Sequence, residues 1–202
     1  INALGKYLLP EIKPYLRDQY LKKLDPDLYE RSDEIRELRK IDYGDNKILQ
    51  YVQNDSIIEF ISYIYETNFD LEQPINPYFL ETNILLTKYS LKLIDYSAFF
   101  GSIKIFKYLV LQKCCLDHDL WFYAIHGGNS EIIQILEDSD VFPQYYSYYI
   151  TCVKYAIICH QNEIANNIIN NYLENIDISS DIIKQSLKSY NFAFLQPEMI
   201  NS

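Results

Sequence analysis

Hydrophobic residues recur along this chain at the three- and four-residue spacing that places them on one face of a helix. One helix is predicted from about residue 46 to residue 53. A second is predicted to begin after Asp55-Ser56, because such residues are typical of helix starts. Its broad apolar face is formed by Ile57, Ile58, Phe60, Ile61 and Ile64. Every strong periodicity in the sequence is helical, so an all-α fold with almost no strand is expected.

A longer pattern repeats within the chain. Residues 93–109 align with residues 120–136 at an offset of 27, and five aligned positions are identical. The identical pairs are Leu93 and Leu120, Tyr96 and Tyr123, Gly101 and Gly128, Ile105 and Ile132, and Leu109 and Leu136. A third copy follows 32 residues after the second, with His160 in place of the glycine, and a fainter fourth spans about 186–195. Near-copies at this spacing predict a stack of similar units.

Each copy carries residues that a helix–turn–helix unit needs. Gly101 and Gly128 are predicted to end the first helix of their copies in a left-handed conformation. Asn129 and Asn162 are predicted to cap the second helix. A small residue four positions before each glycine lets the helices approach closely. One helix pair cannot bury its own apolar face, so the pairs are expected to stack on one another.

These residues resemble the ankyrin pattern. The segments 97–101 (Ser-Ala-Phe-Phe-Gly) and 124–128 (Ala-Ile-His-Gly-Gly) stand where an ankyrin repeat has Ala-Ala-x-x-Gly. The copies look more closely like a divergent ankyrin-domain family of unknown function that some parasitic protists have expanded. The resemblance covers roughly residues 46–195, and it implies a partner-binding module without catalytic activity. The ankyrin period is about 33 residues, so the offset of 27 predicts a tight loop around Cys114–Asp119.

The predicted fold is an α-solenoid of about four degenerate ankyrin-like helix-turn-helix repeats with a helical N-terminal cap. Residues 1–45 form the cap or lead-in, because apolar residues recur there every four positions between Ile12 and Leu24. The boundary is placed at the turn-like sequence 43–45. Residues 46–202 form the repeat stack.

Charge narrows the range of partners. The chain of 202 residues has a net charge of −10, and residues 1–47 hold ten basic and ten acidic residues, so the excess lies beyond them. An acidic body without a basic stripe argues against nucleic acid and against anionic membrane surfaces. Another protein is the expected partner, and one with a basic patch suits the charge. The oligomeric state is left open.

Cysteine usage indicates the compartment. The four cysteines match no extracellular disulfide framework, and two of them are adjacent in the sequence. They are expected to be reduced core residues of an intracellular, cytoplasmic protein. No apolar run reaches the roughly 18 residues that a transmembrane helix needs. The cysteines are Cys114, Cys115, Cys152 and Cys159.

Catalytic and metal-binding hypotheses are weaker than the binding hypothesis. The dipeptide His118-Asp119 occurs in metal-dependent phosphohydrolases, but those sites need an upstream histidine and this chain has none. Zinc would require Cys114, Cys115 and His118 together with Cys159 or His160, without the paired spacing of known zinc sites. Cys159 with His126 is a third hypothesis, a nucleophile and its base. No catalytic residue, metal or cofactor is therefore expected.

The expected binding surface follows the ends of the first helices. In ankyrin stacks the residues just before each turn often face the partner, which here selects Phe99, Phe100, His126, Ile158 and Cys159. Core packing is the competing interpretation for the aromatic residues and for Trp121. The expected function is that of an adaptor or scaffold that binds another protein. The alternatives are a metal-dependent hydrolase assembled from distant residues, and a purely structural spacer.

Overall fold

The computed structural model describes residues 47–75, 83, 85–87, 91–143, 145–174 and 176–195, with Tyr15 and Asp33 as isolated positions. Within these residues the chain forms nine α-helices and one 3-10 helix and contains no strand. The all-α prediction is therefore confirmed for this part of the chain. The predicted N-terminal cap, apart from Tyr15 and Asp33, lies outside the described residues, as does the boundary at 43–45.

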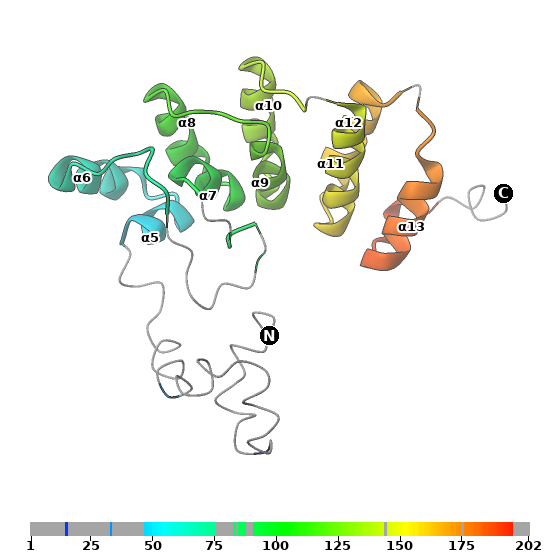
Figure 1. The fold of residues 1–202 in the computed structure, drawn as a ribbon, viewed down its shortest axis with the longest axis horizontal. Helices are drawn as coiled ribbons and strands as arrows, with labels where there is room; N and C mark the ends of the chain where they lie inside the picture. Colours follow the sequence, from blue (N-terminus) through cyan, green and yellow to red (C-terminus); the bar gives the residue numbers. More distant parts are fainter. Residues whose placement is uncertain are drawn as a thin grey trace.

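The helices follow one another in pairs joined by short turns (Figure 1). The first helices of the pairs are α5 (Lys47–Gln53), α7 (Leu93–Phe99), α9 (Leu120–Gly127), α11 (Tyr146–Ile158) and α13 (Ser179–Ser189). The second helices are α6 (Ile57–Thr67), α8 (Ile103–Leu111), α10 (Ser130–Asp138) and α12 (Asn162–Tyr172). The 3-10 helix η3 (Phe192–Phe194) follows α13. Helices α5 and α6 are the two predicted first, and the sequence copies coincide with the later pairs.

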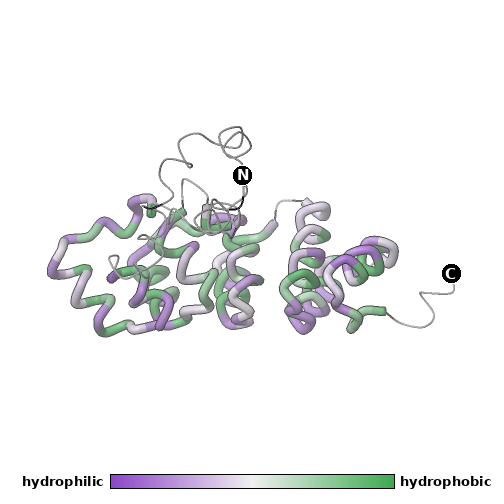
Figure 2. Tube along the Cα trace, turned by 90° about the horizontal axis from the view of Figure 1, so that it is seen from below, coloured by the Kyte–Doolittle hydropathy of each residue, from purple (hydrophilic) through white to green (hydrophobic). Residues whose placement is uncertain are grey.

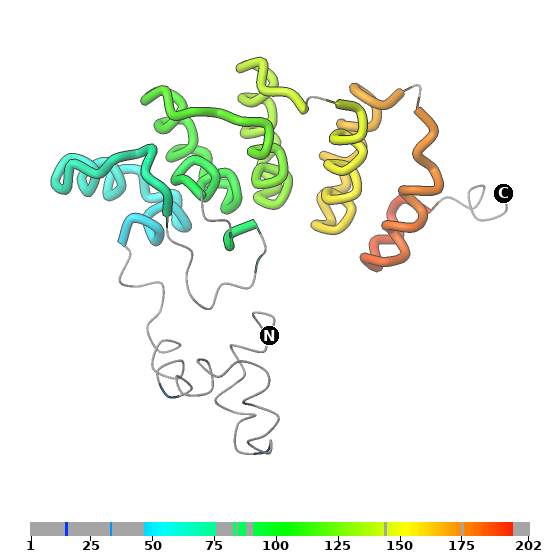
Figure 3. The backbone as a smooth tube through the Cα atoms, viewed as in Figure 1, coloured from blue at the N-terminus to red at the C-terminus, as the bar shows by residue number. Residues whose placement is uncertain are grey.

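The pairs lie side by side in chain order along the longest axis of the molecule (Figure 3). Each first helix contacts the first helix of the next pair, from α5 through α7, α9 and α11 to α13. The second helices make a separate row in which α6 contacts α8 and α8 contacts α10. Because neighbours in space are also neighbours in sequence, each pair buries its apolar face mainly against the pair before and the pair after it.

All five turns that follow a first helix contain a residue in the left-handed region. These residues are Asp55 (φ 49°), Gly101 (67°), Gly128 (66°), His160 (59°) and Tyr190 (56°). At four of the turns, the next residue donates its N–H to the carbonyl five positions earlier, which closes the helix end. The left-handed glycines predicted from the sequence are confirmed, and Asp55 marks an earlier member of the same series.

At three of the turns, the residue that follows the left-handed position forms a side-chain hydrogen bond to the preceding helix pair. Ser102 Oγ donates to the carbonyl of Val52 (2.5 Å), and Asn129 Nδ2 donates to the carbonyl of Gly101 (3.1 Å). In the same way, Asn191 Nδ2 donates to the carbonyl of Ile157 (3.0 Å). These hydrogen bonds join each of the three turns to a carbonyl in or beside the turn of the preceding pair.

The two predicted caps have different outcomes. Asn129 caps α10, since its side-chain oxygen accepts a hydrogen bond from the N–H of Glu131 at 3.0 Å. The predicted cap at Asn162 is wrong, because Gln161 occupies the cap position and Asn162 is already the first residue of α12. The left-handed residue of this turn is His160, so the counterpart of Asn129 is Gln161. The oxygen of Asn162 instead accepts from Asn191 Nδ2 at 2.7 Å.

Residues that repeat in the sequence form successive layers of the core. All five identical pairs except the glycines are at most 2% exposed, and hydrophobic stretches alternate with polar ones along the helices (Figure 2). Trp121, for which core packing is one of the interpretations, is fully buried and donates its ring N–H to the carbonyl of Val141 at 2.7 Å. Gly127 lies against the preceding turn, where an added Cβ would collide with the carbonyl of Ala98. Close approach of α9 to α7 therefore requires glycine here.

Candidate functional site

The predicted binding stripe is only partly exposed. Phe100 exposes 37% of its surface and Ile158 exposes 46%, while Cys159 is half-buried. Phe99 exposes only 6%, so the prediction that it contacts a partner is wrong. Phe99 faces inward because α7 contacts α9 along this side. It supports the exposed ring of Phe100, whose centroid lies 5.0 Å away.

His126 is also engaged within the chain. Its ring stacks on the ring of Phe99, and Nδ1 lies 3.3 Å from the carbonyl oxygen of Phe99. On the other side, Nε2 lies 3.4 Å from Nδ2 of Asn83. Nearby, Tyr123 donates its hydroxyl to the carbonyl of Leu85 at 3.4 Å. Residues from the connection between α6 and α7 therefore contact the first helices where a partner was expected.

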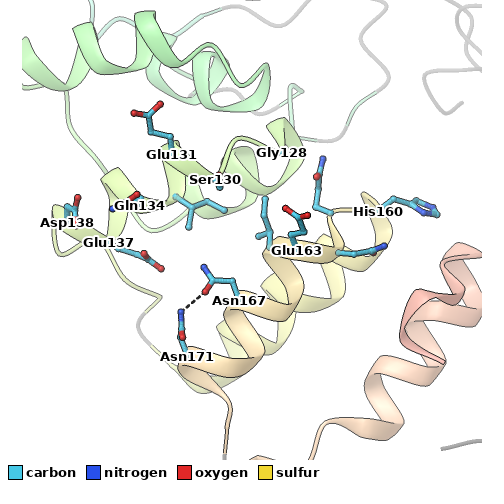
Figure 4. A pocket seen from close by; sticks show the side chains of 14 residues that line it. Gly128, Ser130, Glu131, Gln134, Glu137, Asp138, His160, Glu163, Asn167 and Asn171 are labelled. Carbon is cyan, nitrogen blue, oxygen red and sulfur yellow. Dashed lines mark hydrogen bonds between the residues drawn. The ribbon is translucent and has the colours of Figure 1, made fainter. Parts of the chain in front are cut away.

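A groove lies elsewhere on the molecule, between α10 and α12 (Figure 4). Its volume is about 780 Å³. Helix α10 contributes Glu131, Gln134, Glu137 and Asp138, whose side chains extend from one wall. Because α10 and α12 belong to adjacent pairs, the groove exists only where two pairs stack.

The opposite wall is formed by α12. Glu163, Asn167 and Asn171 line it, and Asn171 Nδ2 donates to Asn167 Oδ1 at 2.5 Å (Figure 4). Two buried isoleucines, Ile133 and Ile164, also belong to its lining. The site thus combines polar walls with an apolar component, as protein-binding surfaces do.

Carboxylates dominate the charge of the groove. Four of them line it, and no Lys or Arg does so among the described residues. Glu131 pairs with Lys107 Nζ of α8 at 2.6 Å, and Glu137 accepts a hydrogen bond from the hydroxyl of Tyr172 at 2.7 Å. Asp138 and Glu163 are exposed and have no cationic partner within the part of the chain that the structure describes. The groove is therefore electrostatically negative.

One feature of the sequence indicates this groove, although the predicted binding stripe does not include it. Glu131 and Glu163 hold the same position in the second and third copies, at an offset of 32. Repetition of a charged residue at a solvent-facing position places like charges on one face of a stack. The sequence alone does not show that the space between the two helices stays open.

Three of the four thiols have a pKa that is raised by burial. Burial raises the pKa of the Cys114 thiol to about 11 and that of Cys152 to about 12, and it also raises the pKa of Cys159. A reactive thiol needs a lowered pKa instead. All four cysteines are free. Cys115 is exposed, so the expectation of a core position is wrong for this residue, which follows the end of α8 in an exposed loop.

Three further findings bear on function. The described residues contain no group of three or more His, Cys, Asp or Glu side chains that could hold a metal ion. Among the same residues, no helix has the length and apolar character needed to cross a membrane. No protein-family model matches the chain, and no curated protein or solved structure matches it.

Proposed function

We propose that this chain is a non-catalytic protein-binding module, built as an α-solenoid of degenerate ankyrin-like helix pairs, that acts as an adaptor or scaffold. The solenoid assignment is supported by the five left-handed turns and by the two rows of helices in chain order. It is also supported by the resemblance of the turn sequences to the ankyrin pattern. Repeat stacks of this kind present extended surfaces that bind other proteins.

The observation that carries the binding function is the groove between α10 and α12. Sites for small molecules are usually enclosed and mostly apolar. This groove is lined instead by exposed, charged and amide side chains along two helices. Such a surface suits an extended segment of another protein. The four carboxylates favour a segment that carries Lys or Arg.

The catalytic alternative has less support. His126 is held between Phe99 and Asn83, and the raised pKa of Cys159 disfavours its thiolate. The zinc hypothesis would need Cys114 as a ligand, yet Cys114 is buried while its neighbour Cys115 is exposed. The described thiols and imidazoles therefore give the hydrolase hypothesis no assembled site.

Quantitative affinity capture tests the proposal. The intact chain, a groove variant (Asp138→Asn with Glu163→Gln) and a control variant (Glu59→Gln with Glu66→Gln) are immobilised at equal density. Each variant loses two exposed carboxylates, so net charge is matched, and the control pair lies on α6. Proteins from a lysate of the source organism are then quantified by mass spectrometry.

We expect the wild-type chain and the control to retain the same partner, and the groove variant to lose it. Retention should also fall with added salt, because the contact is between charges. Equal retention by all three chains would show that the groove is not the binding site. Retention of nothing by the wild-type chain would favour a structural spacer.

A further inference from the structure

A second hollow adjoins the groove between α10 and α12. The two share Asn171, which lines both. The hollow has a volume of about 580 Å³, and its lining residues are Pro143, Tyr145, Tyr146, Tyr149, Asn171 and Tyr172. Four of these six residues are tyrosines, so the neighbour of an acidic groove is an aromatic site. We call it the tyrosine hollow.

The inner side of the tyrosine hollow is fixed by packing. Tyr149 stacks on Tyr172, with ring centroids 4.5 Å apart and planes 16° from parallel. Both rings contact the buried ring of Trp121 edge-on, each at 6.1 Å. The hydroxyl of Tyr172 donates to Glu137 Oε1, so an aromatic wall and a groove carboxylate are joined directly. These rings are held in place before any ligand binds.

The outer side of the hollow is exposed. Tyr145 and Tyr146, at the start of α11, expose 69% and 67% of their surfaces. Both rings are therefore accessible to a ligand, next to the rings that packing holds in place. The face of an aromatic ring is electron-rich and attracts cations, and the attraction is stronger where water is partly excluded.

The surrounding charge favours a cation over a neutral side chain. Residues 128–174 contain six carboxylates and a single Lys or Arg, Lys154. The amine of Lys154 is paired with Asp181 of α13 at 2.5 Å. None of the residues that line the tyrosine hollow or the groove, among those that the structure describes, is Lys or Arg. The described lining residues therefore supply no cation to these rings.

We propose that the tyrosine hollow binds the side chain of a Lys or Arg residue from a basic segment of a partner protein. This inference rests on the proposed function, because the remainder of the segment occupies the adjoining groove. The aromatic faces of Tyr145 and Tyr146 close over the cation, and Glu137 provides the nearby carboxylate. An apolar side chain would contact the same rings but would gain nothing from the carboxylates.

Fluorescence polarisation with two synthetic peptides tests this inference. One is a fluorescein-labelled peptide of alternating Arg and Ser, and the other is its twin with citrulline, a neutral analogue of arginine, in place of Arg. They are titrated with the full chain, with Tyr145→Ala/Tyr146→Ala and with Tyr145→Phe/Tyr146→Phe. The control variant is Tyr65→Ala/Tyr190→Ala, whose tyrosines are 75% and 77% exposed and lie on α6 and after α13.

We expect the arginine peptide to bind more tightly than its citrulline twin. The alanine variant should weaken binding about tenfold, because it removes two aromatic faces. The phenylalanine variant keeps the rings and should retain the affinity, as should the control. Circular dichroism verifies that each variant stays folded, which their exposed positions favour.

Three results would overturn the inference: no binding of the arginine peptide, equal binding of its citrulline twin, or unchanged affinity of the alanine variant. The titration also separates this inference from the proposed function. If Asp138→Asn/Glu163→Gln weakens binding but the alanine variant does not, the groove binds the peptide and the tyrosine hollow does not. Failure of the proposed function appears instead in the capture experiment, as equal retention by the groove variant and its control.

Discussion

The ring of His126 stacks on the ring of Phe99, with ring centroids 3.7 Å apart and planes 13° from parallel. The two residues hold the same position in adjacent copies, two residues before the turn glycine and 27 residues apart. The contact therefore joins like positions of α7 and α9, beside the hydrogen bond from Asn129 to Gly101. Residues that seemed available to a partner hold neighbouring helix pairs together.

This contact predicts different costs for two adjacent phenylalanines. Phe99→Ala should reduce the free energy of unfolding by about 3–5 kcal/mol, because it removes a buried ring from the core. Phe100→Ala should cost well under half as much, since that ring exposes 37% of its surface. Urea denaturation followed by the fluorescence of Trp121 measures both. Equal costs would show that Phe100 also belongs to the core.

The turns provide a second prediction. Val in place of Gly101 or Gly128 should destabilise by about 1–3 kcal/mol, because both have positive φ. Gly127→Ala should cost about as much or more, since its Cβ would lie 2.8 Å from the backbone nitrogen of Gly101. His160→Gly is the matched variant, and it is expected to change stability in the opposite direction.

His160 adopts φ 59° at the same turn position and is exposed, so glycine there should raise stability by up to about 1 kcal/mol. Thermal melting of the four variants provides the comparison. Melting temperatures that do not change for the glycine variants would show that the turns are assigned to the wrong residues.

Two serines at the small-residue position of the repeat should respond in opposite directions. Ser97 Oγ donates to the carbonyl of Ile94 at 2.8 Å, whereas the buried Ser186 Oγ has no hydrogen-bond partner among the described residues. Ser186→Ala should therefore stabilise the fold by up to about 1 kcal/mol, while Ser97→Ala should be neutral or destabilising. Alanine already occupies this position at 124 and 156. A loss of stability in Ser186→Ala, measured by chemical denaturation, would contradict the prediction.

The thiols should differ in their reaction with iodoacetamide. Because burial raises the pKa of Cys152 to about 12, very little of this thiol is present as the reactive thiolate at pH 8. Cys115 is exposed and should react first, with Cys114 and Cys152 slowest. At pH values below the pKa of Cys152, its reaction rate should increase about tenfold each time the pH is raised by one unit. Peptide mass spectrometry follows each site, with urea-unfolded protein as the control. Equal rates at Cys115 and Cys152 in the folded chain would contradict the assigned burial.

The sequence determined the positions of the helix pairs from residue 46 onward and the glycine turns, because these depend on residues close together in the chain. The apolar spacing of a helix and the left-handed preference of Gly101 and Gly128 are local properties. A register error of one residue was enough to misplace the cap at Asn162. The copies also identified the core, since Leu93 and Leu120 and their identical counterparts are buried.

The tertiary structure alone decided which of the remaining residues face solvent. Phe99 and Phe100 are adjacent and chemically identical, yet only Phe99 is buried, because α9 packs on one side of α7. Burial of Phe99 depends on residues of α9, about 27 places further along the chain. The spacing of hydrophobic residues in α7 does not show which side of α7 those residues cover. The groove between α10 and α12 is formed by side chains from two adjacent helix pairs, and the tyrosine hollow by side chains from α11, α12 and the segment just before α11. Both depend on how helices that are separate in the sequence pack together.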